Sequence, residues 1–406
     1  MNFGGQNRVE KYLKNENLKI AYAYFIIFSI LYICDSIYTV IWFRYDHAIE
    51  ITTDILMCIP FFFLQRQNII RLFKCWGGLS VLICVFTLFS GLPQGEIFYL
   101  LGLIIRVVSV SIFITWSAEN KIDIFKASAN TIFVIACFFL ICYIGFDLGV
   151  LGIEGKIISI NIPTGTSFKS TDFTCFCNFY FRWDNVARPV LGMPITRANG
   201  FFRECGEYQI FLNFALLYYW FIEQEKRNLI KEIILVLSVI STASTMGILI
   251  LLCLGVLKIM RQCKKTKMPS WVFIVICAVL AIMALLVLKE KFSNGVVSRS
   301  NNLQHALDLI KAHWVVGNGY AREYKTFYGL LNYFVHFGLL GVLPVYIYIR
   351  GLLHNAFNTD IWGNFALFVW WCSSLLNEAY GYDMFFIAIY LLCLVNIKIR
   401  TERIKE

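Results

Sequence analysis

The sequence predicts an all-α, polytopic integral membrane protein with a single membrane domain over residues 1–406. Hydrophobic residues make up 59% of the chain, charged residues only 15%, and the mean hydropathy is +0.67. This is more apolar surface than one globule in water can bury. The apolar residues also come in blocks of about 15 to 25, separated by short charged clusters, and a helix of that length crosses a bilayer. Many Trp and Tyr lie at the block ends, where the headgroup region favours amphipathic rings.

The apolar blocks predict about twelve membrane helices. The expected segments are 18–42, 49–64, 72–90, 96–116, 125–146, 207–222, 229–243, 245–260, 270–288, 329–350, 361–378 and 382–399. The polar stretch Ser241 to Gly247, at the boundary between 229–243 and 245–260, is either a tight turn or a polar break in one tilted helix. We favour the turn, and therefore two helices.

Short basic clusters set the expected orientation. Arg66, Arg71 and Lys74 form one, and another lies between Arg261 and Lys267. Both lie on the side of the N-terminus, so the positive-inside rule predicts cytoplasmic N- and C-termini in a bacterial cytoplasmic membrane. Topology and anionic headgroups account for the net charge of +10. We therefore expect membrane lipids, and no nucleic acid, as partners.

One arginine lies within an apolar block. Arg106 is in the middle of the segment 96–116, and a lone charge facing lipid is costly, so its guanidinium should face protein or water. Asp35 and Asp54, in neighbouring segments, are the candidate partners. We expect a structural ion pair.

Most of the fourteen cysteines lie inside apolar blocks without recurring spacing, as expected of small packing residues. Cys175, Cys177 and Cys205 fall in a segment expected outside the membrane, where one disulfide could form. No suitably spaced His or Cys accompanies them, so we expect no metal site.

The first of two longer extracytoplasmic segments is 147–206. Its end, Arg197 to Tyr208, contains Arg197 and Arg203 with Glu204 and Glu207, and it leads directly into a membrane helix. Two guanidiniums and two carboxylates are thereby expected at the outer membrane face. Arg182 and Arg188, earlier in the segment, are equally compatible with ordinary solvated loop charge.

The second extracytoplasmic segment is 289–328. It contains Arg299, an apolar periodicity over 303–310 that predicts an amphipathic helix at the outer surface, His305 on that helix, and Arg322. Gly317 and Gly319 are expected to end the helix in a loop.

Basic groups from two outer segments suit a lipid-linked pyrophosphate, because arginine offers a bidentate fork to phosphate oxygens and stays charged near a membrane. Neither segment contains a phosphate-cradling loop of the nucleotide-binding kind, so nucleotide sugars are not the expected donor.

Four places in the C-terminal half resemble the family of bacterial O-antigen and capsular polysaccharide polymerases, often called Wzy-type, and the related O-antigen ligases. They are the segment from Arg197 to Tyr208, the Ser/Thr and Gly break from Ser241 to Gly247, the run from Arg299 to Gly319 and, more weakly, Gly338-Leu339-Leu340-Gly341. The first half of the chain agrees with the family only in being helical.

The resemblance implies a GT-C-like helical fold and transfer of a growing glycan from undecaprenyl pyrophosphate to the non-reducing end of an undecaprenyl-linked repeat unit, outside the cytoplasmic membrane. It implies no metal and no cofactor, and a chain-length regulator is a further candidate partner. The ligases have a His-Asn pair upstream of the Gly-Leu-x-Gly segment, where this chain has Phe327 and Tyr328. That difference favours a polymerase.

The chemistry assigns expected roles. Cations stabilise the charge that develops on the leaving pyrophosphate, and Arg197, Arg203, Arg299 and Arg322 are the candidates. The attacking hydroxyl must lose a proton, so Glu204, and after it Glu207 or His305, is the candidate general base. Glu204 could instead pair with Arg203 or Arg197 and only order the loop.

A flippase or transporter of lipid-linked oligosaccharides is the competing functional class. Transporters more often show an internal repeat and little mass outside the membrane. We find no convincing repeat between the halves of this sequence.

Overall fold

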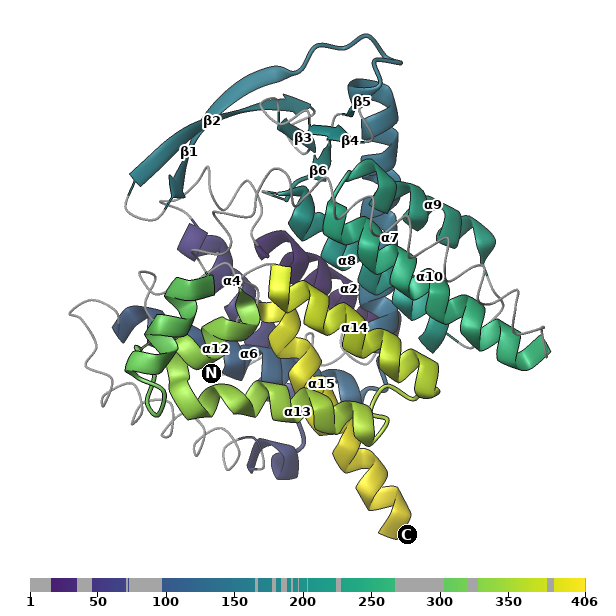
Figure 1. Cartoon of the computed structure of the whole chain (residues 1–406). Coiled ribbons are helices and arrows are strands. Elements are labelled where there is room, and N and C mark those ends of the chain that lie inside the picture. The colour runs from purple at the N-terminus through teal and green to yellow at the C-terminus, as the bar shows by residue number, and fades with distance from the viewer. Residues whose placement is uncertain are drawn as a thin grey trace, which may run out of the picture.

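The computed structural model is a helical bundle with a small β-sheet at one end, and the C-terminal helix projects at the other end (Figure 1). It describes residues 16–34, 46–70, 72, 97–164, 167–176, 180–183, 188–190, 193–195, 197–202, 204–223, 228–266, 303–319, 328–377 and 383–405.

Helices make up most of the described chain. In order they are α2 (Glu16–Ile33), α4 (Asp46–Cys58), η1 (Ile59–Phe63), α6 (Ile97–Glu119), α7 (Ile124–Cys142), η2 (Tyr143–Asp147), α8 (Cys205–Leu217), η3 (Tyr218–Ile222), α9 (Leu229–Ser241), α10 (Thr245–Thr266), α12 (Gly329–Phe337), η5 (Gly338–Gly341), α13 (Val342–Leu353), α14 (Ile361–Asn377) and α15 (Met384–Lys405). Residues 303–312 form a further helix.

Several helices have their polarity reversed relative to helices of water-soluble proteins. On α9 the exposed side chains are Ile230, Ile233, Leu237 and Ile240, while Glu232 on the same helix is buried. Apolar residues on the outside and polar residues on the inside are the arrangement that lipid favours, because hydrocarbon cannot solvate charge. The bundle is therefore built for a membrane.

Five helical stretches in the described residues are long and apolar enough to cross a bilayer. They are Glu16–Ile33, Leu100–Glu119, Ile124–Asp147, Thr245–Lys264 and Gly329–Leu353. Shorter apolar helices cover Ile361–Leu376 and Met384–Asn396. The expected segments overlap helices throughout, except 72–90 and 270–288, which lie outside the described residues apart from residue 72. The region 229–260 is two helices, joined by a turn at Ala243 with φ of +45°.

Residues 147–206, the first segment expected outside the cytoplasm, contain a sheet that the sequence did not lead us to expect. Strands β1 (Lys156–Thr164), β2 (Ser167–Phe176), β3 (Tyr180–Trp183) and β6 (Ala198–Gly200) pair antiparallel in that order, with Lys156 opposite Cys175 and Phe181 opposite Gly200. A second hairpin joins β4 (Arg188–Val190) to β5 (Met193–Ile195). Because β6 is the last strand, the sheet leads almost directly into α8.

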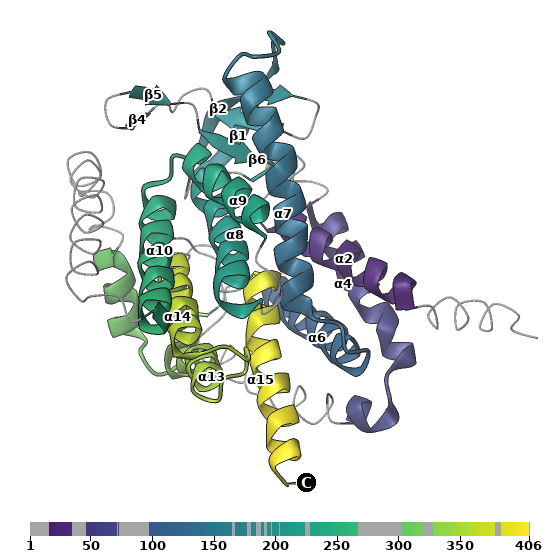
Figure 2. The ribbon, with the colours of Figure 1, turned by 90° about the vertical axis from the view of Figure 1, so that its right-hand side faces the viewer.

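Helix α7 connects the bundle to this sheet. It packs against α8 and α9 and rises past them to the sheet (Figure 2). At its upper part the ring of Phe139 contacts Tyr180, Phe201 and Tyr208, with ring centroids 5.3–5.8 Å apart. A Cβ on Gly200 would lie 2.1 Å from the Phe139 ring, and φ of Gly200 is +63°, so this position requires glycine. The aromatic contacts fix the height of β6 above α8.

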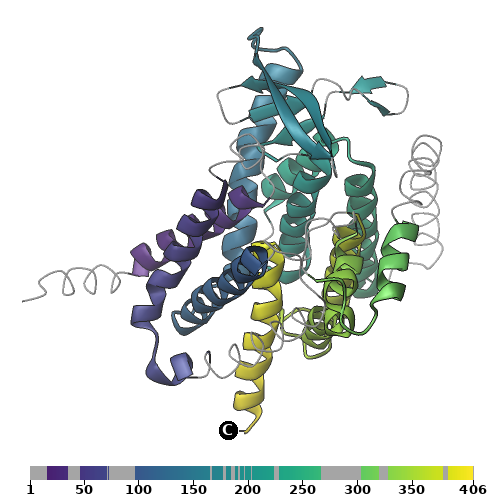
Figure 3. The same cartoon turned by 90° about the vertical axis from the view of Figure 1, so that its left-hand side faces the viewer.

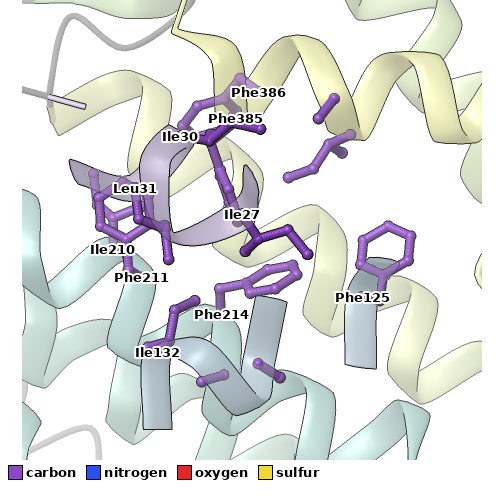
Figure 4. Packing of buried hydrophobic residues seen from close by; sticks show 14 of the residues in the cluster. Ile27, Ile30, Leu31, Phe125, Ile132, Ile210, Phe211, Phe214, Phe385 and Phe386 are labelled. Carbon is purple, nitrogen blue, oxygen red and sulfur yellow. The ribbon is translucent and has the colours of Figure 1, made fainter. Parts of the chain in front are cut away.

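The bundle core is apolar where α2, α7, α8 and α15 meet. Ile27, Phe125, Phe214 and Phe385 converge there (Figure 4). The indole N–H of Trp370 on α14 donates to the carbonyl of Ile210 on α8, at 2.9 Å. Helices α2 and α4 lie on one flank of the bundle, and α12 and α13 on the other (Figure 3). Helix α8 is thus enclosed on several sides, and the candidate site lies at its first turn.

Candidate functional site at the start of α8

The first turn of α8 is capped by its own carboxylates. Glu204 has an extended backbone, and its N–H donates to Oε2 of Glu207 at 3.2 Å. Glu207 is almost fully buried, with 1% of its surface exposed, whereas Glu204 is partly exposed. Carboxylates here satisfy helix N–H groups and complement the positive end of the helix dipole. Glu207 thus has a structural role in capping α8. If it were the general base, it would have to combine proton transfer with this role.

Arg197 connects the segment before α8 to the turn between α9 and α10. Its Nη2 donates to the carbonyl of Ala243 at 2.8 Å. Its Nε is buried and has no hydrogen-bond partner among the described residues. Two of the four places that carry the family resemblance, distant in sequence, are therefore in direct contact.

The polar residues of the turn satisfy its own backbone. The hydroxyl of Ser241 donates to the carbonyl of Ser238 at 2.8 Å, and that of Thr242 donates to the carbonyl of Val239 at 2.7 Å. The hydroxyl of Ser244 accepts from the N–H of Gly247 at 3.3 Å. The composition of this break is thus explained by capping two helix ends inside the protein.

A buried amide pair beneath the turn escaped the sequence analysis. Gln209 and Asn213, one helical turn apart on α8, are both fully buried. Nδ2 of Asn213 lies 3.0 Å from Oε1 of Gln209 and 3.3 Å from the carbonyl of Gly247, while Oδ1 of Asn213 has no partner among the described residues. Polar side chains four residues apart in an apolar segment were the available signal.

The other two places of resemblance also meet. The N–H of Asn318 donates to the carbonyl of Val335 at 2.7 Å, and the N–H of Leu339 donates to the carbonyl of Val315 at 3.1 Å. A Cβ on Gly317 or on Gly338 would lie 2.3–2.5 Å from the opposing backbone, and both glycines have positive φ. The turn after the helix 303–312 therefore packs on the junction between α12 and α13.

Of the four arginines expected to bind the pyrophosphate, Arg197 is the one that lies among the described residues. Arg203, Arg299 and Arg322 lie outside the described residues. His305 is exposed on the helix 303–312, and no hydrogen bond or ion pair in the described part joins it to Arg197 or Glu204. Arg182 and Arg188 lie in β3 and β4.

Arg106 forms an intramembrane ion pair, but with a different partner from those expected. Its Nη2 lies 2.9 Å from Oε2 of Glu50 on α4. Oδ1 of Asp54, one turn further along α4, lies 2.5 Å from Oγ of Ser109. Asp35 lies outside the described residues. Glu50 was missed because sequence spacing alone does not reveal which turns of two helices meet.

Cysteines near the sheet are thiols. Cys175 and Cys205 are buried and form no disulfide with each other, and Cys177 lies outside the described residues. Within the described ranges no group of three His, Cys, Asp or Glu side chains is arranged to hold a metal ion.

One further polar contact ties the sheet to α7. The hydroxyl of Tyr180 on β3 donates to Oδ2 of Asp147, at the end of η2, at 2.5 Å. Burial and the neighbouring carboxylate raise the pKa of Tyr180 well above its ordinary value. The phenol therefore stays protonated and acts as a hydrogen-bond donor.

Comparison of the chain with models of protein families, with curated proteins and with solved structures finds no match.

Proposed function

We propose that this membrane protein is a polysaccharide polymerase. It transfers a growing glycan from undecaprenyl pyrophosphate to the non-reducing end of an undecaprenyl-linked repeat unit, at the outer face of the cytoplasmic membrane. The observation that carries the proposal is the contact of Arg197 with Ala243, because it joins two family-like segments beside the start of a buried helix.

Arg197 is suited to receive a phosphate oxygen. One of its N–H groups is used by Ala243, and its buried Nε–H donates to no described residue. A guanidinium that is held in place and partly desolvated stabilises developing negative charge more strongly than one in water. Arg203, six residues along the chain, and Arg299 and Arg322 of the other outer segment complete the proposed clamp.

Glu204 is the best candidate for the general base. It is partly exposed, and no ion pair among the described residues joins it to Arg197. Glu207 is buried in the helix cap, and His305 is on a separate helix. A carboxylate at the rim of the site can take a proton from an acceptor hydroxyl once the bound glycan excludes water.

A flippase remains the second candidate, because Arg106, Glu50 and Asp54 place ionisable groups within the bundle. Transporters use such groups, whereas the proposed polymerase chemistry takes place at the outer surface. A ligase-like glycan transferase would use the same donor.

Substitution of Arg197 tests the proposed role of its charge. Arg197→Gln removes the charge and keeps a polar side chain, although the shorter glutamine no longer reaches the carbonyl of Ala243. We expect transfer to fall about 100-fold or more, with loss of long chains on a polysaccharide gel, while the amount of protein in the membrane is unchanged. Glu204→Gln should give the same loss.

The matched control is Lys311→Ala, which removes an exposed cation from the other outer segment. It should leave chain length unchanged. Normal long chains from a well-expressed Arg197→Gln protein would remove this arginine from the mechanism and reduce its role to tethering the turn.

A further inference from the structure

The α4–α6 contact contains more acid than base. Helix α4 exposes Ile51 and Ile55 and buries Thr53 and Asp54 on its opposite face. Glu50, one turn before Asp54, shares that inner face. The acidic side chains thus point away from lipid and towards α6.

Among the side chains that the structure describes in this contact, two carboxyl groups share one cation, Arg106. Arg106 on α6 lies 2.9 Å from Glu50, and each contributes one charge of opposite sign. Asp54 is 8% exposed and has Ser109 as its hydrogen-bond partner. Two further described side chains near this contact are neutral: Cys58 on α4, and Tyr22 on α2, which donates to the carbonyl of Leu56.

The number of hydrogens available for hydrogen bonds around Ser109 also points to the carboxyl group of Asp54. Oγ of Ser109 lies 2.5 Å from Oδ1 of Asp54 and 3.0 Å from the carbonyl oxygen of Arg106. A hydroxyl has a single hydrogen and makes one full two-centre hydrogen bond at a time. Both contacts are such bonds at once only if Asp54 supplies a hydrogen of its own.

We infer that Asp54 is a proton-binding site within the membrane and carries its proton at neutral pH. The acid O–H donates to Oγ of Ser109, and the Ser109 hydroxyl donates to the carbonyl of Arg106. The contact then contains one ion pair and one neutral acid, which avoids the high cost of a second buried carboxylate. Loss of the proton leaves an excess negative charge between α4 and α6. The inference does not depend on the proposed function.

Infrared spectroscopy of the full chain in a detergent without ester groups tests this inference, because a protonated carboxyl group has a carbonyl stretch that is resolved from carboxylate bands. The wild-type chain at pH 7, grown with aspartate labelled with ¹³C at its side-chain carboxyl, should show an acid band shifted by the label. A band that does not shift would assign the proton to a glutamate, and absence of an acid band would leave Asp54 ionised. Either result overturns the inference.

Variants assign the band to one residue. Asp54→Asn, which keeps the shape and hydrogen bonding of the side chain, should abolish the aspartic acid band, whereas Asp308→Asn, at an exposed position, should leave it unchanged. Glu50→Gln should also abolish the band, because Asp54 then ionises to pair with Arg106. An aspartic acid band that persists in folded Asp54→Asn protein contradicts the assignment. If the Asp54→Asn chain does not fold, a wild-type spectrum without an aspartic acid band still overturns the inference.

Discussion

Gly247 illustrates how closely the turn is packed on α8. A Cβ at this position would lie 2.8 Å from Cβ of Gln209, whereas a Cβ on Gly255, on the same helix α10, would meet nothing within 4 Å. The approach at Gly247 also brings its carbonyl to Asn213. The glycine therefore allows the contact that seats the turn beneath Arg197.

Gly247→Ala should lower the free energy of unfolding by about 1–3 kcal/mol, because the buried Gln209 side chain has to move. Gly255→Ala should be neutral or stabilising by up to about 1 kcal/mol, because alanine favours a helix more than glycine does. Thermal unfolding of the purified variants in detergent measures the difference. Equal stability of the two variants would show that α8 and α10 are not in close contact here.

At the scale of single residues, the sequence identified important side chains better than it identified the groups that they contact. Arg197 and the stretch from Ser241 to Gly247 were both singled out, but nothing in the sequence indicated that Ala243 would accept from the arginine. The partner is a backbone carbonyl, which every residue has. Glu50 and Asn213 were missed because their importance comes from contacts between helices.

At the scale of secondary-structure elements, cation–π contacts join the end of α8 to α9 and α10. The π-helical turn η3 at the end of α8 presents three successive aromatic rings, and each ring faces a cation from α9 or α10. The buried carboxylate of Glu232 lies 2.7 Å from one of these cations, Lys258. The stacked pairs are Lys231 over Tyr219, Lys258 over Trp220 and Arg261 over Phe221, with the cation 4.6, 4.3 and 5.7 Å from the ring centroid.

Lys258→Met should destabilise the protein by about 3–5 kcal/mol, because the buried carboxyl group of Glu232 then loses its ammonium partner and must either stay charged without compensation or take up a proton. Lys258→Met combined with Glu232→Gln should recover much of the loss. Chemical unfolding of the single and double variants gives the coupling energy. Simple addition of the two single losses would contradict an energetic link between these side chains.

The sheet is the element that the sequence analysis missed. Residues 156–164 contain Ile158, Ile160 and Ile162 alternating with polar residues, a period-two pattern typical of a strand. The surrounding Gly, Pro, Ser and Thr content instead suggested a loop. The membrane helices were easier to predict, because length and hydropathy alone identify a segment that can cross a bilayer.

For the whole molecule, the proposed orientation predicts that the sheet lies outside the cytoplasmic membrane. Ile157 on β1 is exposed, so Ile157→Cys should react with a membrane-impermeant maleimide in intact cells, above the background set by the native cysteines of the wild-type chain. Reaction only after permeabilisation would place the sheet in the cytoplasm and reverse the topology.

The functional account makes its most direct prediction about where substrate collects when the protein is absent. In a strain that lacks this chain, single lipid-linked repeat units should accumulate on the outer face of the cytoplasmic membrane, where a lectin reaches them in intact spheroplasts. The wild-type chain should restore long polymer, and Arg197→Gln should not. Repeat units that become accessible only after the membrane is permeabilised would mean that flipping, not polymerisation, had been lost, and would contradict the account.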